Sequence, residues 1–508
     1  MVIADIIKRW QTLQGREAIL CTGTDEHGMK IQQAADAAGI DPKPFCDRGA
    51  EVFKMLAEQG GISYDHFVRT TSPEHRDAVE YVWHLLQERG HIYASKHEGW
   101  YSVSDETFYP QSGVHLTLDP RTGRKGMTSI ETGSSVEWTS ESNYHFRLSD
   151  FRDKLLAFYQ SNEDFVLPSS RRDWVIQSVK DGLEDLSISR PVERLSWGIR
   201  VPNDDTQTIY VWLDALVNYL TKSGFPWTPG QEASGGWPAD CHVIGKDIVR
   251  FHCIYWPAFL LALDVPPPRQ ILTHAHWTLG RRKMAKSTGN VVNPFFALDR
   301  FGTETMRFYL AHDGGLDHDS DYGNEQIVER YKHCLQGALG NLASRIVRGK
   351  GWDVRASVRD AASERPTHPA SGAQKERVIR LHLSFQEHMD CLRISKAVRD
   401  IIATIDETNK YLQLTSPWVS VNSGSAEQKL LVPDIIYTCG ESLRISGILL
   451  QPFMPGKAAM LLDMLGVADD RRGFSWARLG ADLSYGTSTI ELGRGHQGSL
   501  FPPPRSIE

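Results

Sequence analysis

Short apolar runs that end in polar clusters are the feature of this sequence that most restricts its fold. "EAILCTG" (residues 17–23) leads into "TDEHG", "CHVIG" (241–245) leads into "KD", and "QILTHAH" (270–276) ends in two histidines. Helical patterns follow the first two runs, which is the alternation of strand and helix found in parallel α/β sheets. Ligands of such sheets bind beyond the carboxyl ends of the strands. The sequence therefore predicts a Rossmann-type α/β body whose polar clusters meet at one cleft.

An insertion and a helical region are predicted to accompany this α/β body. Segments such as "EGWYSVSDETFYP" alternate aromatic with polar residues, which indicates a β-rich insertion. The stretch near 351–376 is polar and is predicted to be a loop. We expect the first part of the body at 1–94, the insertion with a helical return at 95–185, the second part of the body at 186–279, a loop region at 280–325, an α-helical bundle at 326–468 and a poorly ordered tail at 469–508.

Composition excludes several classes of protein. The 508 residues carry a formal net charge of −7, so a nucleic acid would have to bind through local basic patches. The seven cysteines include no C-x-x-C pair, which predicts neither a zinc knuckle nor a disulfide framework. No apolar run approaches the roughly 20 residues of a membrane-spanning helix, and we expect no membrane partner.

One short segment concentrates positive charge on this acidic chain. "GRRKMAKSTGNVV" (280–292) places Arg281, Arg282, Lys283 and Lys286 within six residues. A solvated surface loop is the ordinary interpretation. The alternative is a phosphate-binding loop, because lysines on a flexible segment with Gly and Ser can close over a polyphosphate and neutralise its developing charge.

The polar clusters at the strand ends also have two interpretations each. Asp25 could cap the next helix or bind a ligand ammonium group. Lys246 and Asp247 could bind phosphate and ribose, or could be solvated charges in a turn. Trp212, Tyr219 and other aromatic residues at helical spacing usually belong to a core, although they could also form the soft apolar pocket that suits a thioether.

The chain resembles a known family at several of these places in order. "KMAKS" is similar to the KMSKS signature of class I aminoacyl-tRNA synthetases, with Ala285 replacing a serine. Together with "GTDEHGMKIQQAA", "DLSISR", "WGIRVP", "YVWLDAL" and "IGKDIVRFH", it resembles methionyl-tRNA synthetases over residues 1 to about 465. The resemblance implies that L-methionine and ATP, accompanied by Mg²⁺, form methionyl-adenylate, and that methionine then passes to tRNA(Met).

The resemblance also implies roles for individual side chains. Methionine would be bound by its ammonium group at Asp25 and by its side chain among Trp212, Ala215, Tyr219, Ile248, His252 and Trp256. ATP would contact Arg190, Lys246, Asp247, His274 and Lys286, with Lys283, Lys286 and His274 as the catalytic group. The helical bundle would read the anticodon with Asn341, Arg345 and Trp418, although Asn341 by itself could equally be a helix-packing amide.

Departures from the family pattern lead to further expectations. The family's HIGH motif would precede residue 1, so the first strand and the HIGH turn are expected to be missing, and a catalytically impaired fragment or a tRNA-binding protein is the alternative function. The insertion has Ser102 and no cysteine, which implies no zinc. A zinc-free chain without an appended dimerisation domain resembles the mitochondrial branch, so we expect a monomer in the mitochondrial matrix, with the cytoplasm as the alternative.

Overall fold

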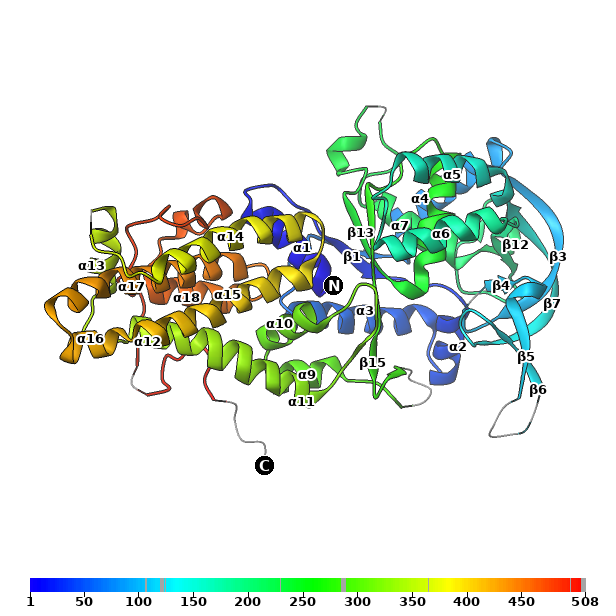
Figure 1. Cartoon of the computed structure of the whole chain (residues 1–508). Helices are drawn as coiled ribbons and strands as arrows, with labels where there is room; N and C mark the ends of the chain where they lie inside the picture. Colours follow the sequence, from blue (N-terminus) through cyan, green and yellow to red (C-terminus); the bar gives the residue numbers. More distant parts are fainter. Residues whose placement is uncertain are drawn as a thin grey trace. The chain divides into compact units, whose positions relative to one another are not determined.

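The computed structural model describes residues 1–105, 107–118, 123, 125–228, 230–284, 289–363, 365–493 and 495–503. It divides into two compact units (Figure 1). The α/β unit comprises Cys21–Leu56 and Tyr64–His274, and the helical unit comprises Met1–Leu20, Ala57–Ser63 and Ala275–Glu508. Each unit is described by itself.

Two groups of parallel strands form the centre of the α/β unit. β1 (Cys21–Thr24) pairs with β2 (His66–Arg69), and β14 (Gln270–His274) lies between β13 (Cys241–Gly245) and β8 (Val166–Leu167). Gly245 is paired with His274, so β13 and β14 end side by side. The three strands predicted from the apolar runs are therefore confirmed, although the first one begins only at Cys21.

Helices cover these strands. They are α2 (Met29–Ala38), α3 (Pro42–Gln59), α4 (Pro73–Glu88), α5 (Arg152–Ser161), α6 (Ser169–Asp181), α7 (Val211–Thr221) and α8 (Trp256–Ala262). Ser72 caps α4 by accepting a hydrogen bond from the His75 backbone N–H, and Pro73 follows at the first helical position. A π-helical turn at Phe251–Tyr255 precedes α8. Such turns often occur at functional sites.

The predicted insertion is an antiparallel sheet. Its strands are β3 (Ile92–Ser102), β4 (Thr107–Tyr109), β5 (Val114–Leu118), β6 (Lys125–Ser129) and β7 (Ser135–Phe146), in the order β4-β3-β7-β6-β5. β9 (Leu186–Ser187) pairs with β7, and a second small sheet has the order β10 (Ser189–Pro191), β12 (Asp204–Ile209) and β11 (Arg200–Val201). The β-rich insertion is thus confirmed, and it begins at Ile92.

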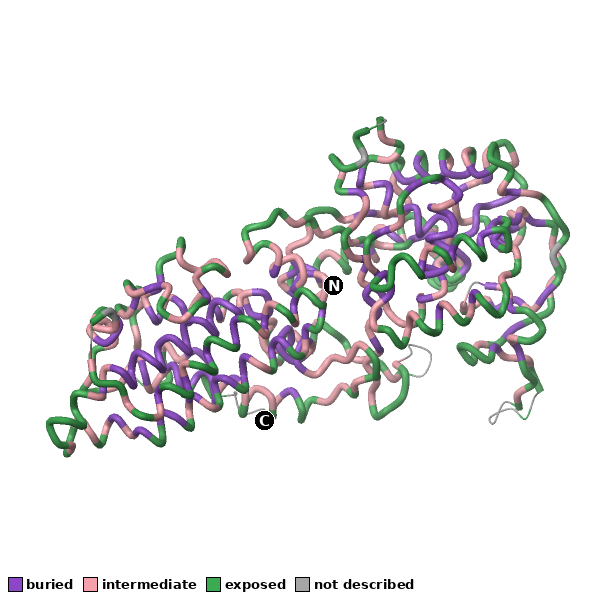
Figure 2. The backbone as a smooth tube through the Cα atoms, turned by 45° about the horizontal axis from the view of Figure 1, so that its top comes forward, coloured by how far each residue is buried: buried purple, intermediate pink, exposed green. Residues whose placement is uncertain are grey.

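The helical unit is built around long helices with one continuous apolar core. Its elements are α1 (Val2–Leu13), β15 (Trp277–Leu279), β16 (Arg282–Lys283), α9 (Pro294–Phe301), α10 (Thr303–Asp313), β17 (Ser320–Asp321), α11 (Asn324–Arg330), α12 (Asn341–Val347), α13 (Val354–Arg359), α14 (Ser371–Asp390), α15 (Ile394–Thr415), α16 (Pro417–Ser423), α17 (Ala426–Leu450) and α18 (Pro455–Leu465). Helices α14, α15, α17 and α18 lie side by side, with buried segments along their facing sides (Figure 2).

Two expectations about the helical region are wrong. The polar stretch near 351–376 contains α13, because the Asp353 side chain accepts a hydrogen bond from the Ala356 N–H and starts a helix there. The segments 469–493 and 495–503 are not a poorly ordered tail. Tyr485 and Phe501 are buried in the same core as the long helices. The buried Arg444 guanidinium also donates to the backbone carbonyls of Trp476 and Arg478.

A buried ion pair explains why the first helix belongs to the helical unit rather than to the α/β body. Arg307 of α10 donates to the Asp5 carboxylate of α1 at 2.5 Å, and both side chains are almost fully buried. The same guanidinium donates to the carbonyl oxygens of Phe453 and Gly60, while Asp5 also accepts from the Ser63 backbone N–H. A buried charge requires such partners, and here they join four separate segments of the chain.

Candidate active site and anticodon-binding surface

The ends of β13 and β14 bring three of the predicted ATP-binding residues together. A Cβ placed on Gly245 would lie 2.6 Å from Oδ1 of Asp247 and 3.9 Å from Cε1 of His274. Asp247 therefore folds back over the backbone of Gly245, and the His274 ring is adjacent. Lys246, which stands between Gly245 and Asp247 in the sequence, is half-buried, while Asp247 is exposed. Carboxylate, ammonium and imidazole groups are thus placed within one small region at the strand ends.

The polar residues after β1 include one buried carboxylate and one exposed carboxylate. Glu26 is buried, and its carboxylate accepts two hydrogen bonds from Arg69 at 2.7 and 2.9 Å and one from the Thr24 hydroxyl at 2.6 Å. This bidentate pairing ties the ends of β1 and β2 together. Asp25, by contrast, is exposed at the strand end. The predicted ammonium ligand is therefore the carboxylate that faces outward, and its neighbour is structural.

His27 takes part in a buried charged cluster that the sequence did not indicate. Its Nδ1 lies 2.6 Å from one carboxylate oxygen of Asp214, and Nε2 of His75 lies 2.6 Å from the other. Burial alone would raise the pKa of Asp214, but the charge and hydrogen bonds of the two imidazoles lower it to about 2. Burial alone would lower the pKa of His27, but the Asp214 carboxylate raises it. The cluster connects the end of β1 to α4 and α7.

The Tyr219 hydroxyl and the His252 ring form a hydrogen-bonded pair. The Tyr219 oxygen lies 2.7 Å from Nε2 of His252, and Nδ1 of the same ring lies 3.0 Å from the Ile248 carbonyl oxygen. A carbonyl only accepts, so Nδ1 carries the proton and Nε2 accepts from Tyr219. Burial lowers the pKa of His252 to about 4, although the Ile248 carbonyl opposes this shift. The imidazole is therefore neutral at physiological pH.

Aromatic rings surround this pair. Trp212 stacks on Phe251 at a centroid distance of 3.6 Å, and the ring of Tyr219 lies 6.0 Å from that of Trp256. Ala215 is on the same helix as Trp212 and Tyr219. The structure thus brings Trp212, Tyr219, His252 and Trp256 together in one aromatic group that contains a hydrogen-bonded polar pair. The binding of methionine by this group stays a prediction.

His242 is a residue of this region that the sequence analysis missed. It lies on β13, is 4% exposed, and its ring centroid is 4.0 Å from that of Tyr219. Neither ring nitrogen has a hydrogen-bond partner among the described residues. Burial and the nearby His252 lower the pKa of His242 to about 3. The sequence contained one signal for His242, a histidine within the apolar run "CHVIG" just before "KD". Buried polar side chains normally have hydrogen-bond partners, so a histidine inside an apolar strand is unusual.

Arg190 does not join the ATP-binding residues. It is 1% exposed, and its guanidinium is enclosed by the rings of Tyr101, Phe108 and Tyr210 at 4.7 to 5.2 Å. It also donates to the Ser187 hydroxyl at 2.9 Å. This geometry leaves the charge little surface to offer a ligand. The basic residue of "DLSISR" instead holds the insertion to the second small sheet.

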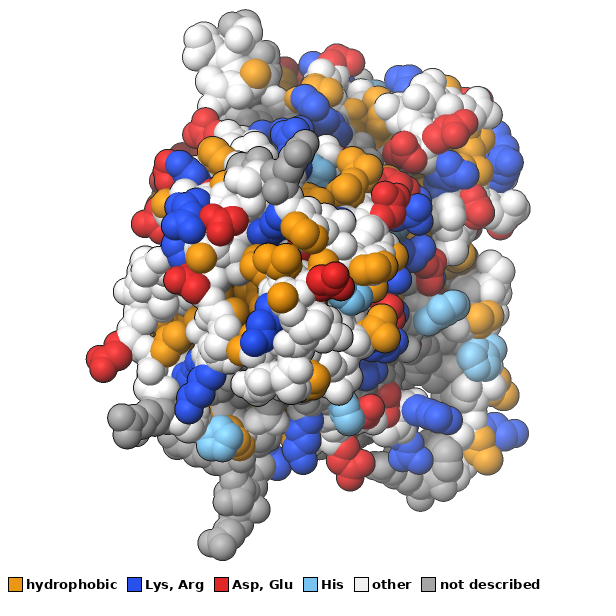
Figure 3. Space-filling model, turned by 60° about the vertical axis from the view of Figure 1, so that its left-hand side comes forward, with side chains coloured by type: hydrophobic (Ala, Val, Ile, Leu, Met, Phe, Trp, Pro, Cys, Tyr) orange, Lys and Arg blue, Asp and Glu red, His pale blue; other side chains and the backbone are white. Residues whose placement is uncertain are grey.

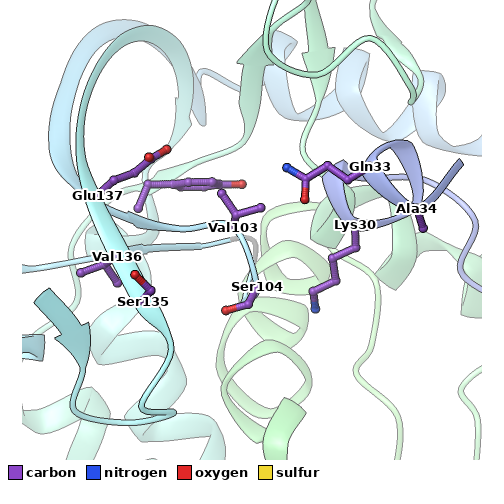
Figure 4. A pocket seen from close by; sticks show the side chains of 9 residues that line it. Lys30, Gln33, Ala34, Val103, Ser104, Ser135, Val136 and Glu137 are labelled. Carbon is purple, nitrogen blue, oxygen red and sulfur yellow. The ribbon is translucent and has the colours of Figure 1, made fainter. Parts of the chain in front are cut away.

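A separate pocket of about 620 Å³, lined by both polar and apolar side chains, lies between α2 and the insertion (Figure 4). Lys30 and Gln33 approach it from α2, and Ser104, Ser135 and Glu137 approach it from the insertion. The residues predicted to bind methionine or ATP do not line it. Val103 and Val136 also line it, so this pocket combines charged and apolar side chains.

The lysine segment belongs to the helical unit. β15 and β16 form a hairpin in which Leu279 pairs with Arg282, and Gly280 and Arg281 have φ angles of 61° and 59°. Two positive φ angles are typical of the tight type I′ turn. Lys283 is therefore on a short exposed strand rather than on the predicted loop. Lys286 falls in 285–288, outside the described residues.

Asn341, Arg345 and Trp418 form one cluster on the helical unit. The Arg345 guanidinium lies 4.8 Å from the centroid of the Trp418 ring. Asn341 and Arg345 of α12 contact Asn409 and Gln413 of α15 at 3.4 and 3.5 Å. On the face shown in Figure 3, basic and acidic side chains are intermingled. Asn341, Arg345 and Trp418 thus combine amide, guanidinium and aromatic groups in one place, and a role in binding RNA stays a prediction.

Two further findings concern metals and membranes. Among the residues that the structure describes, no group of three or more His, Cys, Asp or Glu side chains could hold a metal ion. In the same residues, no helix is both long enough and apolar enough to span a bilayer.

Comparison with known proteins explains this set of features. Residues 1–347 match the family of class I tRNA synthetases of the methionine type, and residues 368–491 match the anticodon binding domain of methionyl tRNA ligase. The chain is also 52% identical to a probable mitochondrial methionine–tRNA ligase of Neurospora crassa, over 99% of this chain and 82% of that protein. The chain belongs to the methionyl-tRNA synthetase family.

Other relatives of this synthetase agree with the assignment. The human mitochondrial methionine–tRNA ligase is 40% identical over 93% of the chain and 81% of its own length. The structure of the Mycobacterium tuberculosis methionyl-tRNA synthetase in complex with methionyl-adenylate superimposes with a TM-score of 0.88 at 36% identity, covering 99% of this chain and 95% of that one. The synthetase therefore combines a class I catalytic domain with a helical anticodon-binding domain, as the sequence predicted.

Proposed function

We propose that the chain is a methionine–tRNA ligase that couples ATP cleavage to the formation of methionyl-adenylate and then of methionyl-tRNA(Met). The observation that carries this proposal is the Tyr219–His252 pair within a group of aromatic rings. A neutral, hydrogen-bonded pair in an apolar pocket suits an uncharged thioether and disfavours charged side chains of similar length.

All the residues predicted to bind methionine or ATP, except Arg190, have a proposed role in the first step. Asp25 binds the ammonium group of methionine, and Trp212, Ala215, Tyr219, Ile248, His252 and Trp256 line the side-chain pocket. Lys246, Asp247 and His274 bind ATP at the strand ends. Arg190 is left out of the binding group because its guanidinium is enclosed by aromatic rings.

Lys283 and Lys286 are proposed to act on the phosphates of ATP. In-line attack of the methionine carboxylate on the α-phosphorus breaks the bond to the β-phosphate oxygen and releases pyrophosphate. Negative charge grows on the leaving group during this step, and lysine side chains stabilise it. Mg²⁺ is proposed to arrive bound to the phosphate oxygens of ATP, because the described residues offer no carboxylate cluster of their own.

The second step requires recognition of the tRNA. Asn341, Arg345 and Trp418 are proposed to read the CAU anticodon by base-edge hydrogen bonds and stacking. The enzyme is proposed to act as a monomer. The mitochondrial relatives support a role in mitochondrial translation.

Methionine-dependent exchange of pyrophosphate into ATP tests the proposal. The chain is expected to catalyse exchange with L-methionine and not with L-leucine or L-glutamate, and to charge a tRNA(Met) transcript. Binding of tRNA without any methionine-dependent exchange or charging would contradict the ligase assignment and support a tRNA-binding protein instead.

A further inference from the structure

Two helices of the helical unit present amide side chains to each other beside the proposed anticodon-binding residues. Asn341 of α12 is exposed, and its Nδ2 lies 3.4 Å from Oδ1 of Asn409 on α15. Nδ2 of Asn409 lies 3.1 Å from the Ala338 carbonyl oxygen and 3.2 Å from the Ile405 carbonyl oxygen. Asn409 is thus bonded on both ends of its amide, whereas Asn341 is bonded on only one end among the residues that the structure describes.

These contacts determine how each amide is oriented. Two carbonyl oxygens face the same atom of Asn409, and that atom must be the nitrogen because an oxygen would be repelled there. The Asn409 oxygen consequently faces Asn341, and the Asn341 atom that meets it must also be the nitrogen. The remaining oxygen of Asn341 and one of its N–H bonds are left for another partner.

We propose that Asn409 is a positioning residue that fixes the Asn341 carboxamide in one orientation for reading the anticodon. The inference rests on the proposed anticodon role of Asn341. With its orientation fixed, Asn341 accepts a hydrogen bond from the exocyclic amino group of an adenine or cytosine and donates to the adjacent ring nitrogen. Guanine and uracil carry a carbonyl oxygen where those bases carry the amino group, and it would face the Asn341 oxygen.

Asn409 also explains why a flexible amide can discriminate between bases. A freely rotating carboxamide can exchange its donor and acceptor positions, so it would accept either type of base edge. Holding one orientation removes that exchange before the tRNA binds. Asn409 itself need not contact the tRNA.

A double-mutant cycle tests this coupling. The kcat/KM for tRNA(Met) charging is measured for the unaltered chain, Asn341→Ala, Asn409→Leu and the double variant. Asn341→Ala is expected to lower kcat/KM by roughly 10- to 100-fold, mainly through the KM for tRNA. Asn409→Leu, which keeps the branching of the side chain and removes its polar atoms, is expected to lower it by about tenfold in the presence of Asn341 and by less than about twofold in its absence.

The matched control is Thr404→Val. It removes the hydrogen bond that the Thr404 hydroxyl donates to the Asp400 carbonyl within α15, and it leaves the contact between Asn341 and Asn409 in place. It is expected to leave the KM for tRNA unchanged. A second readout uses a transcript in which uridine replaces the anticodon cytosine. The preference for the CAU transcript should fall in Asn409→Leu and remain intact in Thr404→Val.

The outcomes separate the inference from the function on which it rests. If Asn409→Leu costs as much without Asn341 as with it, then Asn409 acts through helix packing and the inference is overturned. If Asn341→Ala leaves the KM for tRNA unchanged, the anticodon role of Asn341 fails as well. Should Asn409→Leu fold poorly in thermal melts, Asn409→Ser, which is also too short to hold Asn341, replaces it in the same cycle.

Discussion

The Tyr219 hydroxyl donates to Nε2 of His252 over 2.7 Å, and this bond is available only because the Ile248 carbonyl keeps the ring proton on Nδ1. The consequence is a directed chain of hydrogen bonds from the pocket wall to the backbone. The Tyr219 hydroxyl can therefore donate this bond only while the His252 imidazole is neutral, and burial keeps it neutral.

Replacing Tyr219 by phenylalanine tests this chain. Tyr219→Phe is expected to raise the KM for methionine about tenfold with little change in kcat, because a buried acceptor on His252 loses its partner at a cost of roughly 1–3 kcal/mol. The measurement is methionine-dependent pyrophosphate exchange. Tyr81→Phe, at a 41% exposed position on α4, is the control and should leave the KM unchanged. An unaltered KM in Tyr219→Phe would contradict the role of the pair.

The two buried histidines predict a loss of stability in acid. Burial lowers the pKa values of His242 and His252 to about 3 and about 4, below the ordinary value of 6.5. The unfolded chain therefore binds protons that the folded chain excludes. The stabilisation is complete above pH 6.5 and is lost as the pH falls towards 4, by about 2–3 kcal/mol for each ring at pH 4.5. Urea unfolding from pH 7.5 to 4.5 measures this slope, and His252→Gln should reduce it by about half.

Asp214 is expected to be the most sensitive position of its cluster. Asp214→Asn removes the carboxylate that is bonded to both His27 and His75, and it should lower the free energy of unfolding at pH 7 by about 3–5 kcal/mol.

The pKa of His27 is raised, whereas that of His252 is lowered, so the two histidines make stability change with pH in opposite directions. The contribution of His27 is present below pH 6.5 and is lost as the pH rises through the folded-state pKa. His27→Gln should therefore cost less stability at pH 9 than at pH 6, and an equal cost at both values would refute the charged pair.

Lys286 is expected to act on the phosphates rather than on methionine. Lys286→Ala should lower the rate of pyrophosphate exchange by roughly 100-fold or more, the size found when one group that stabilises developing charge is removed. The dissociation constant for methionine, measured by tryptophan fluorescence, should change by less than twofold. Lys43→Ala, at an exposed position on α3, serves as the charge-matched control. Equal losses of exchange and methionine binding would argue against a phosphate role.

Local patterns predicted the parts of the fold that depend on neighbouring residues. The apolar runs predicted β13 and β14, and the alternation of aromatic with polar residues predicted the insertion. The four-residue spacing of Asn341 and Arg345 placed both on one face of α12, where Trp418 joins them. Periodicity and capping operate over a few residues, and so a single sequence contains them.

The remaining features depend on contacts between distant segments. Asp214 meets two histidines that lie 187 and 139 residues away, and no local pattern links them. The enclosure of Arg190 could not be predicted, because its cage comes from three separate strands or turns. The docking of segments 469–493 and 495–503 on the helical unit was missed for the same reason. Their polar composition indicates a tail, whereas a few apolar anchors and the Arg444 guanidinium dock them on the long helices.

The partners of α1 have a consequence for the order of synthesis. Asp5 and Arg307 are 302 residues apart, and Trp10 packs against Phe385 and Phe474, which are synthesised later still. At roughly 5–20 residues per second, the apolar face of α1 waits about 15–60 s on the ribosome before Arg307 is available, and longer for the aromatic rings. The apolar face of α1 is thus buried only after most of the chain that follows it has been made. A chaperone that binds short amphipathic segments would find it accessible throughout the synthesis of the α/β unit.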